Sequence, residues 1–437
     1  MSVPGLIVAA AASGTGKTTL TLALLRLLAR SGRRVASAKT GPDYIDPAFH
    51  AAASGRASFN LDPWAMRRET LAATLALIEA GAELVICEGV MGLFDGIGAA
   101  GEGSTADLAA ITGWPVVIVL DVHGQAATAA AVLAGLARHR SDIRIAGVIL
   151  NRVGSPSHAE TVAEASRRAL PDVKVLGAVR RSGDLARPER HLGLVQAREH
   201  GDLERFLDRA ASAIEKALDT DALIALAQPS RLKASGGIAP LVPLGQRIAV
   251  ADDLAFAFAY PGVLAGWRAA GAEVRLFSPL ADEAPEARAD AVFLPGGYPE
   301  LHAGRLAANE AWRRGLAEAA ARGAAIYGEC GGYMALGQGL VDAGGVRHRM
   351  AALLPVETSF AERKLHLGYR EIASDAATPL GPAGTRFRGH EFHYARETGG
   401  EGEPLFRAHD ARGRDLGAVG RRNGSVFGSF LHLIDRR

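Results

Sequence analysis

Cysteine is almost absent from this sequence, with only Cys87 and Cys330 among 437 residues. This scarcity excludes a disulfide-stapled scaffold and a four-cysteine zinc site, and it fits a reducing compartment. Neither sign of charge dominates, because 49 Lys and Arg residues face 47 Asp and Glu residues, a formal net charge of +2. That balance speaks against a dedicated nucleic-acid-binding protein, which usually carries a basic excess.

Long apolar runs are missing as well. Segments such as 6–12 and 115–120 fall far short of the roughly 20 residues that a membrane-spanning helix needs. The first residues, Met-Ser-Val-Pro-Gly, lack the basic segment that opens a secretory signal. We therefore expect a soluble, cytoplasmic protein that does not associate with a membrane.

The N-terminal half alternates short apolar runs with helical patterns. Because the runs are apolar throughout and separated by helices, they predict a doubly wound parallel sheet covered on both faces. The expected strands are 6–9, 35–38, 84–87, 116–120, 145–150 and 173–178, and the expected helices are 18–30, 69–79, 128–138 and 158–168.

The same alternation restarts after residues 227–245, whose three Pro, three Gly and lack of periodicity are typical of a linker. A second α/β domain is therefore expected. Its strands are predicted at 248–251, 273–277, 291–294 and 324–327, with helices at 261–270 and 309–322. We divide the chain into a domain of residues 1–230, a linker of 231–246 and a domain of 247–437.

A phosphate-binding loop is the first chemical signal. The run Ala10-Ala-Ala-Ser-Gly-Thr-Gly-Lys-Thr-Thr19 follows the first strand and precedes an amphipathic helix, where backbone N–H groups and the helix N-terminus favour an anion. The strict pattern has glycine where this chain has Ala11, and a glycine-rich turn is the alternative. The predicted nucleotide-binding residues are Ser13, Gly14, Thr15, Gly16, Lys17, Thr18 and Thr19, with the Thr18 hydroxyl on Mg²⁺.

Polar residues follow three further strands, at the edge of a parallel sheet where ligands bind. Lys39, Asp43 and Tyr44 are predicted to contact substrate, although a plain turn would explain part of this Gly-Pro-Asp segment. Asp46 and Glu88 are predicted as metal ligands, because Mg²⁺ prefers carboxylate oxygens. Asn151 is a weaker candidate for an adenine contact, with a turn residue as the equal alternative.

The C-terminal half carries a nucleophile signal. Ala324-Ala-Ile-Tyr-Gly-Glu-Cys-Gly-Gly-Tyr333 reads as a strand, a Gly-x-Cys-x-Gly turn and a helix, the pattern of a nucleophile elbow with Cys330 as nucleophile. We expect the helix N-terminus to lower the pKa of its thiol. Backbone N–H groups of Gly296 and Gly297 are candidates for an oxyanion site. A buried, inert thiol in a tight turn is the alternative.

A nucleophilic cysteine needs a base, and several histidines follow Cys330 in the sequence. Candidates are His348, His366, His390, His393 and His432, of which His432 is placed at a strand end by Gly428-Ser-Phe-Leu-His432. The run His390-Glu-Phe-His393 superficially resembles a metal cluster, but no third ligand is obvious. We interpret it as a polar loop or a domain-interface segment.

These motifs together resemble the cobyrinic acid or hydrogenobyrinic acid a,c-diamide synthase family of cobalamin biosynthesis. The N-terminal half is similar to dethiobiotin synthetase-like P-loop proteins. The C-terminal half is similar to class I glutamine amidotransferases. The family-like runs are 39–47 with His50, Phe59-Asn-Leu-Asp62, 88–96, 188–195, Gly-Gly-Tyr-Pro-Glu-Leu at 296–301, Gly-Glu-Cys-Gly-Gly at 328–332, Leu367-Gly-Tyr-Arg370, 388–393 and 428–432.

The resemblance implies an ATP- and Mg²⁺-dependent ligase that hydrolyses glutamine at Cys330, with His432 as base. The released ammonia would amidate the a- and c-carboxylates of the corrinoid acid through acyl phosphates. The related amidotransferases usually carry Glu two residues after the base, where this chain has Ile434, so a Cys–His pair or an orienting group from elsewhere is expected. The resemblance also implies a homodimer.

Four other functions compete with this one. Cobyric acid synthase amidates other carboxylates of the same ring, and nickel-sirohydrochlorin amidation is a further related reaction. A partitioning-type P-loop ATPase would bind DNA or membrane, and it would leave Cys330 unexplained. A glutaminase-like interaction protein would have a damaged phosphate loop, yet Gly16-Lys17-Thr18 is intact. A weak compositional argument favours the metal-free hydrogenobyrinic acid as substrate.

Overall fold

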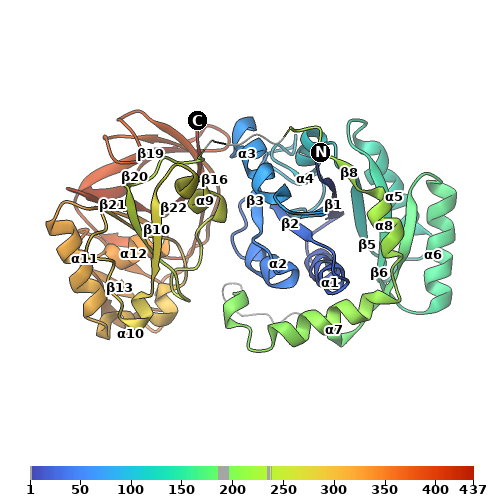
Figure 1. The fold of residues 1–437 in the computed structure, drawn as a ribbon, viewed down its shortest axis with the longest axis horizontal. Coiled ribbons are helices and arrows are strands. Elements are labelled where there is room, and N and C mark those ends of the chain that lie inside the picture. The colour runs from blue at the N-terminus through green and yellow to red at the C-terminus, as the bar shows by residue number, and fades with distance from the viewer. Residues whose placement is uncertain (1, 186–195, 234–236, 238) are drawn as a thin grey trace. The chain divides into compact units, whose positions relative to one another are not determined.

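The apolar runs of the N-terminal half form a sheet whose main strands are all parallel (Figure 1). Its strand order is β3-β2-β4-β1-β5-β6-β7, and the short β8 pairs antiparallel with β1. The strands are β1 (Pro4–Ala10), β2 (Val35–Thr40), β3 (Phe59–Leu61), β4 (Leu84–Glu88), β5 (Val116–Asp121), β6 (Ile145–Val153), β7 (Lys174–Arg180) and β8 (Gln228–Pro229). The residues of β2 and β4 are buried throughout, which explains their continuous apolar pattern.

Eight helices of this half connect or cover the described strands. They are α1 (Lys17–Arg30), α2 (Asp46–Ser54), α3 (Arg68–Glu79), α4 (Thr105–Thr112), α5 (Thr128–His139), α6 (Pro156–Ala169), α7 (Leu203–Glu215) and α8 (Thr220–Leu226), with short 3₁₀ turns at Gly183–Leu185 and Ala197–Glu199. All six strands and four helices expected in this half are present, with ends shifted by no more than three residues. The loops after β1, β2 and β4 all leave the carboxyl ends of parallel strands. The predicted phosphate-binding and metal-binding residues therefore lie on the same side of the sheet.

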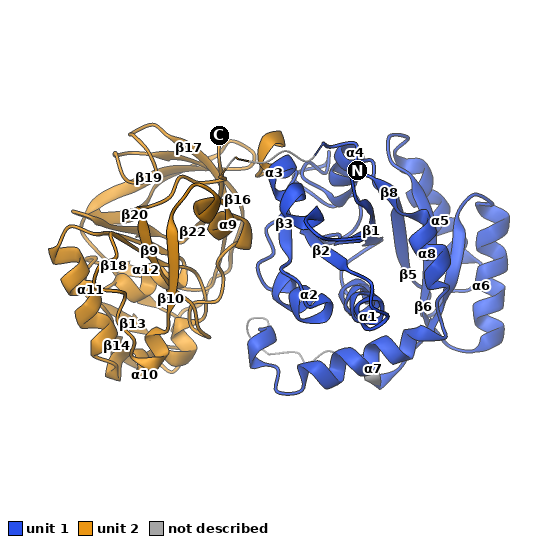
Figure 2. Ribbon diagram, viewed as in Figure 1, with its two compact units in different colours: residues 1–64, 71–236 blue, residues 65–70, 237–437 orange. Residues whose placement is uncertain are grey.

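The computed structural model describes residues 2–185, 196–233, 237 and 239–437. The family-like run 188–195 and part of the expected linker lie outside this range. The chain divides into two compact units (Figure 2): residues 1–64 with 71–236, and residues 65–70 with 237–437. No helix in the described part of the chain is long and apolar enough to cross a membrane.

A mixed sheet organises the second unit, in the order β10-β9-β11-β12-β21-β20-β19-β16-β17-β22. The first five strands are parallel, and antiparallel pairing begins at β20. Its strands are β9 (Arg247–Ala251), β10 (Glu273–Phe277), β11 (Ala291–Leu294), β12 (Ala325–Glu329), β16 (His366–Ser374), β17 (Arg386–His393), β19 (Glu403–Asp410), β20 (Asp415–Asn423), β21 (Val426–Ser429) and β22 (Leu431–Arg436).

Helices and a small second sheet complete this unit. The helices are α9 (Pro261–Ala269), α10 (Ala303–Ala308), α11 (Ala311–Ala321) and α12 (Gly331–Leu336), with 3₁₀ turns at Pro279–Ala281 and Pro299–His302. The small sheet contains β13 (Gly339–Val341), β14 (Arg347–Arg349), β15 (Glu357–Ser359) and β18 (Arg396–Gly399). The expected strands and helices of this half are all present, but the antiparallel strands after residue 366 had no counterpart in the expectation.

A segment distant in sequence also belongs to the second unit. Residues 65–70 group with 237–437 rather than with their sequence neighbours. Arg67 explains this, since its backbone N–H and its guanidinium both donate to Asp435, at 2.7 and 2.8 Å, and Asp435 is only 1% exposed. A buried carboxylate needs such a partner, so β22 and this segment stabilise each other.

Candidate active sites

The phosphate loop lies between β1 and α1, and a neighbouring asparagine holds it in shape. Gly16 caps α1 with a φ of 89°, in the left-handed region. The Asn151 amide donates to the carbonyl of Thr15 at 2.8 Å, and a Cβ on Gly16 would lie 2.4 Å from its Nδ2 atom. Only glycine fits both the conformation and this close approach. Asn151, predicted to contact adenine, therefore uses its N–H group to support the loop.

Arg152 supports the same loop from the next position. Its guanidinium donates to the carbonyl of Gly14 at 2.8 Å and to the Asp121 carboxylate at 2.6 Å. A cavity of about 390 Å³ opens beside this point, lined by Gly16, Thr19, Leu20, His123, Asn151, Arg152, Arg180, Arg181, Ser182 and Leu185. Its position beside the phosphate loop and its basic lining fit the base and sugar of a nucleotide.

Side chains of the predicted phosphate and metal set meet at the carboxyl end of β4. The Thr18 hydroxyl donates to Glu88 at 2.5 Å, and the Lys17 ammonium donates to the carbonyl of Met91 at 3.0 Å. Glu88 is fully buried, so its charge depends on such partners. The structure therefore brings Glu88 to the phosphate loop, although Thr18 and Glu88 are 70 residues apart in sequence.

Lys39 connects the two carboxylates that were predicted as metal ligands. Its ammonium donates to Asp46 at 2.6 Å and to Glu88 at 2.8 Å, and its side chain is 4% exposed. Burial alone would lower the pKa of Lys39, but the two carboxylates outweigh burial and raise it. Lys39 was predicted to contact substrate, whereas here its ammonium is occupied by two carboxylates of the chain.

His50 completes this group, although the sequence analysis did not predict it as a site residue. It lies four residues after Asp46 on α2, hence on the same helix face, and its Nε2 is 2.6 Å from Glu88 Oε2. Burial works against the ionised form of Glu88, but Lys39 and His50 outweigh it, so the pKa of Glu88 lies well below its usual value. Glu88 is therefore ionised at neutral pH.

Two further candidates lie in the segment between β2 and α2. Asp43 accepts from the backbone N–H of Ile45 at 2.8 Å, and burial together with Asp46 raises its pKa to about 6. Tyr44 is 8% exposed. Asp43 therefore shapes the turn that leads into α2, in agreement with the simpler interpretation of this segment, and it lies 3.9 Å from the Lys39 ammonium.

Replacing Lys39 by Met should destabilise the N-terminal unit by about 3–5 kcal/mol, because it leaves buried carboxylates without their cation. The measurement is urea-induced unfolding followed by circular dichroism. Arg34→Met is the matched control, since Arg34 pairs with Glu83 at the surface, and there we expect a loss of only about 0–1 kcal/mol. Equal losses in the two variants would contradict the inferred role of Lys39.

The magnesium prediction can be tested against the donor atoms. The Thr18 hydroxyl and the Glu88 carboxylate are oxygen ligands of the kind Mg²⁺ takes, and they are adjacent at the end of the phosphate loop. These two residues fit the ion. Asp46, the third predicted ligand, belongs to the same cluster, because it accepts from the Lys39 ammonium, which also donates to Glu88.

The second unit holds Cys330 in a strained turn between β12 and α12. Its φ and ψ are 46° and −103°, a backbone conformation that residues other than glycine rarely adopt. Glycines make the turn feasible, since a Cβ on Gly332 would lie 1.9 Å from the carbonyl of Leu294. Backbone strain of this kind is typical of a nucleophile elbow.

His432 is the histidine that the fold brings to Cys330. A Cβ built on Gly296 would lie 2.3 Å from His432 Cε1, 3.1 Å from its Nε2 and 3.4 Å from Cys330 Cβ. The two side chains therefore converge on one point beside Gly296. Burial, together with His390 and His393, lowers the pKa of His432 to about 3. The imidazole is neutral at neutral pH, as a general base must be.

The predicted oxyanion residues border the same point. A Cβ on Gly331 would lie 2.8 Å from the backbone nitrogen of Gly297, so the loop after β11 lies against the elbow. The Cys330 sulfur lies 3.8 Å from the carbonyl of Phe392. Main-chain groups therefore border the space around the sulfur. Among them, an N–H group such as that of Gly297 would stabilise a charged oxygen, whereas the Phe392 carbonyl would not.

The expected lowering of the Cys330 pKa is wrong. Burial raises the pKa of this thiol well above its usual value, and the charges of Glu300, Glu329 and Glu391 add to the effect. The backbone N–H of Gly331 acts in the opposite direction but is weaker. The short α12 cannot compensate for full burial, so the resting state is a neutral thiol beside a neutral imidazole.

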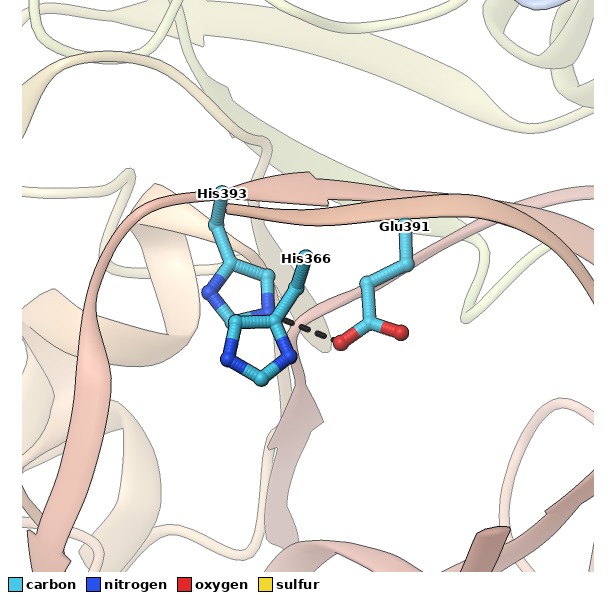
Figure 3. A group of neighbouring side chains, drawn as sticks. All are labelled: His366, Glu391 and His393. Carbon is cyan, nitrogen blue, oxygen red and sulfur yellow. Dashed lines mark hydrogen bonds and ion pairs between the residues drawn. The ribbon is translucent and has the colours of Figure 1, made fainter. Parts of the chain in front are cut away.

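His390 and His393 belong to strand β17 and not to a loop, which corrects that part of the sequence interpretation. Figure 3 shows that His393 and Glu391 have a third neighbour, His366, which the strand register places opposite His393. Glu391 accepts from Arg370 at 2.7 Å and lies 2.8 Å from His393 Nε2.

This cluster has the residue types of a metal site but not the geometry. The rings of His366 and His393 stack with an interplanar angle of 2° and a centroid distance of 4.6 Å. Their nitrogen lone pairs lie in parallel planes and do not converge on one ion. We interpret the cluster as an ion-paired network beside Cys330. The charge of Glu391 contributes to the raised pKa of the Cys330 thiol.

Family models match both halves of the chain. Residues 6–195 match the CobQ/CobB/MinD/ParA nucleotide binding domain, and residues 247–437 match the CobB/CobQ-like glutamine amidotransferase domain. The alignment with a solved structure of a glutamine amidotransferase covers 43% of this chain and 90% of that chain at 20% sequence identity. Its TM-score of 0.29 is too low to support a structural argument.

Curated relatives match almost the whole chain. A protein of Brucella abortus is 55% identical, with 99% of this chain and 98% of the relative covered. Relatives from Rhizobium meliloti and Mesorhizobium japonicum are 53% and 52% identical, covering 99% and 100% of this chain and 99% of each relative. All three are named hydrogenobyrinate a,c-diamide synthase. The chain therefore belongs to the hydrogenobyrinate a,c-diamide synthase family, and it combines a nucleotide-binding domain with a glutamine amidotransferase domain.

Proposed function

We propose that this protein uses ATP and glutamine to amidate the a- and c-carboxylates of hydrogenobyrinic acid. The observation that carries the proposal is that relatives with this name match the chain from end to end, while both groups of reactive side chains are assembled. Residues 1–230 would bind the nucleotide and the corrinoid acid, and residues 247–437 would hydrolyse glutamine. The protein would act in the cytoplasm as a homodimer, without nucleic acid or membrane.

Glutamine hydrolysis would begin with proton transfer from Cys330 to His432. The thiolate would attack the side-chain amide carbon of glutamine and form a tetrahedral intermediate whose oxyanion is held by the N–H groups of Gly296 and Gly297. The intermediate would collapse to a thioester as His432 returns the proton to the leaving ammonia. Water would then release glutamate and restore the thiol.

Amide synthesis requires an activated carboxylate, because an oxide is a poor leaving group and phosphate is a good one. The substrate carboxylate would attack the γ-phosphoryl group of ATP and release ADP. Ammonia would then displace phosphate from the acyl phosphate and form the amide. The phosphate loop from Ser13 to Thr19 would hold the nucleotide, with the Lys17 ammonium on its β- and γ-phosphates.

Mg²⁺ held by Thr18 and Glu88 would neutralise charge on the transferring phosphoryl group. Lys39 keeps Glu88 ionised and thereby available to the ion. Two residues of α2 hold these side chains in place: Asp46 accepts a hydrogen bond from Lys39, and His50 contacts Glu88. Asp43 and Tyr44 remain candidates for contacts with the corrinoid acid, and Asn151 and Arg152 order the loop that binds phosphate.

A product assay tests this function. The protein is incubated with ATP, Mg²⁺, glutamine and either hydrogenobyrinic or cobyrinic acid, and products are counted by mass spectrometry. Each conversion changes the mass by the difference between a hydroxyl and an amino group. We expect two conversions of hydrogenobyrinic acid. Two conversions of cobyrinic acid alone would change the substrate, four would indicate a cobyric acid synthase, and none with ATP hydrolysed would favour a partitioning-type ATPase.

A further inference from the structure

Glu329, the residue before the nucleophile, is a buried carboxyl group with a defined set of partners. It ends β12 and is 3% exposed. Its Oε1 atom accepts from the Tyr327 hydroxyl at 2.8 Å and from the backbone N–H of Leu433 at 3.0 Å. The Tyr327 ring is stacked between Phe293 and Phe427 on the neighbouring strands. A rigid core therefore holds this carboxyl group in one orientation.

The second oxygen of Glu329 faces the catalytic base. Its Oε2 atom lies 3.7 Å from His432 Nδ1, while the Cε1 and Nε2 side of the ring lies at Gly296 beside Cys330. The imidazole thus stands between a carboxyl group and the thiol. The distance is longer than a hydrogen bond, but catalytic hydrogen bonds are often long before substrate binds.

We propose that Glu329 is the positioning residue of the glutaminase site and holds His432 in the tautomer that accepts a proton from Cys330. This inference rests on the proposed glutamine hydrolysis. In related amidotransferases a glutamate two residues after the base orients it. Ile434 occupies that position here and cannot do so, because its side chain has no polar group and is packed in the core. The proposal assigns this orienting role to Glu329. The acid thus comes from the strand of the nucleophile and not from that of the base.

The positions of protons follow from the contacts of the carboxyl group. Because Oε1 already accepts two hydrogen bonds, a proton on Glu329 would reside on Oε2. Ionised Glu329 accepts the N–H of His432 Nδ1 and leaves Nε2 with a lone pair for the thiol proton. Protonated Glu329 would donate to Nδ1 instead and place the ring proton on Nε2, where the base is blocked.

This arrangement predicts how glutamine hydrolysis varies with pH. Burial raises the pKa of Glu329 to about 8, with the Tyr327 hydroxyl and the Leu433 N–H acting in the opposite direction. His432 stays neutral across this range because burial lowers its pKa to about 3. Other charged or titratable neighbours of His432 include His390, His393 and Glu391 on β17, the Cys330 thiol, and Tyr260 before α9, whose ring centroid lies 6.5 Å from that of His432. Glutaminase activity should therefore increase as the pH rises through about 8.

Glu329→Gln tests the inference with an isosteric side chain. Its oxygen can still accept from Tyr327 and Leu433, but its NH₂ group faces Nδ1 and holds the blocked tautomer. We expect kcat for glutamate release to fall about 10²-fold above pH 8, KM to change little, and the rise through about pH 8 to disappear. The measurement is glutamate release by the full-length protein across this pH range, with Glu318→Gln on the exposed face of α11 as control.

A second variant decides the question if Glu329→Gln fails to fold. Tyr327→Phe removes a hydrogen bond that lowers the pKa of Glu329, so the rise in activity should move to higher pH. Thermal unfolding followed by circular dichroism, compared with that of the wild type, reports whether each variant is folded. A Glu329→Gln protein with the wild-type kcat and pH profile, or an unmoved profile in Tyr327→Phe, would overturn the inference. A wild-type protein that releases no glutamate would instead refute the proposed function.

Discussion

Cys330→Ala should lose glutamine-dependent amidation by at least about 10³-fold, because no other group can form the thioester. Amidation with free ammonia should persist, since the nucleotide site contains no part of the elbow. The measurement compares initial rates of amide formation with glutamine and with an ammonium salt as the nitrogen source. This is the largest difference between two nitrogen donors that any single substitution in the chain should produce.

Cys87→Ala is the matched control for that experiment. Cys87 is also fully buried, and burial raises its thiol pKa to about 12, but its sulfur lies 3.5 Å from the Thr40 hydroxyl within the parallel sheet. Its loss should leave the use of both nitrogen donors unchanged. If Cys330→Ala used glutamine as well as the wild type does, the amidotransferase site would lie elsewhere.

Lys17→Ala should abolish amidation with either nitrogen donor. In the proposed function the ammonium group of Lys17 stabilises charge on the phosphates of ATP, and removing a group with this role costs about 10²- to 10³-fold. Burial lowers the pKa of Lys17, and the carboxylate of Glu88 opposes this. The measurement is amide formation with glutamine and with free ammonia, together with ADP release.

Lys174→Ala serves as the control, because Lys174 is exposed at the start of β7. It should retain wild-type rates with both donors. Ammonia-dependent synthesis that survives in Lys17→Ala within a few-fold would separate the phosphate loop from the reaction and remove the case for an acyl phosphate. The pair of variants therefore dissects the two halves: Cys330 affects one nitrogen donor, whereas Lys17 affects both.

Local patterns were sufficient to identify the chemistry of each half. The phosphate loop and the elbow are continuous in sequence, and their glycines are required by local backbone geometry at Gly16 and around Cys330. The parallel strands were predictable because strands buried on both faces leave a continuous apolar run. The antiparallel strands from β16 to β22 were not, since their partly exposed faces carry charged residues that hide such a run.

Partnerships between distant residues depended on the tertiary structure. Lys39 looked like a substrate ligand because a lysine after a strand suits an anion, yet the fold surrounds it with Asp46 and Glu88. Residue spacing alone could not choose among five histidines, and His432 was favoured as the base by the family resemblance. The pairing of β21 with β12 and the turn into β22 bring His432 to Cys330.

The thiol and its acid illustrate the same division. Sequence predicted that Cys330 is a nucleophile in a turn, because that depends on neighbouring glycines. It predicted the wrong direction for the thiol pKa, because that depends on burial and on three glutamates from separate elements. It also left the orienting acid open, since Glu329 acts across the sheet on His432. Local conformation is encoded by adjacent residues, whereas burial and charge pairing arise only when distant strands pack together.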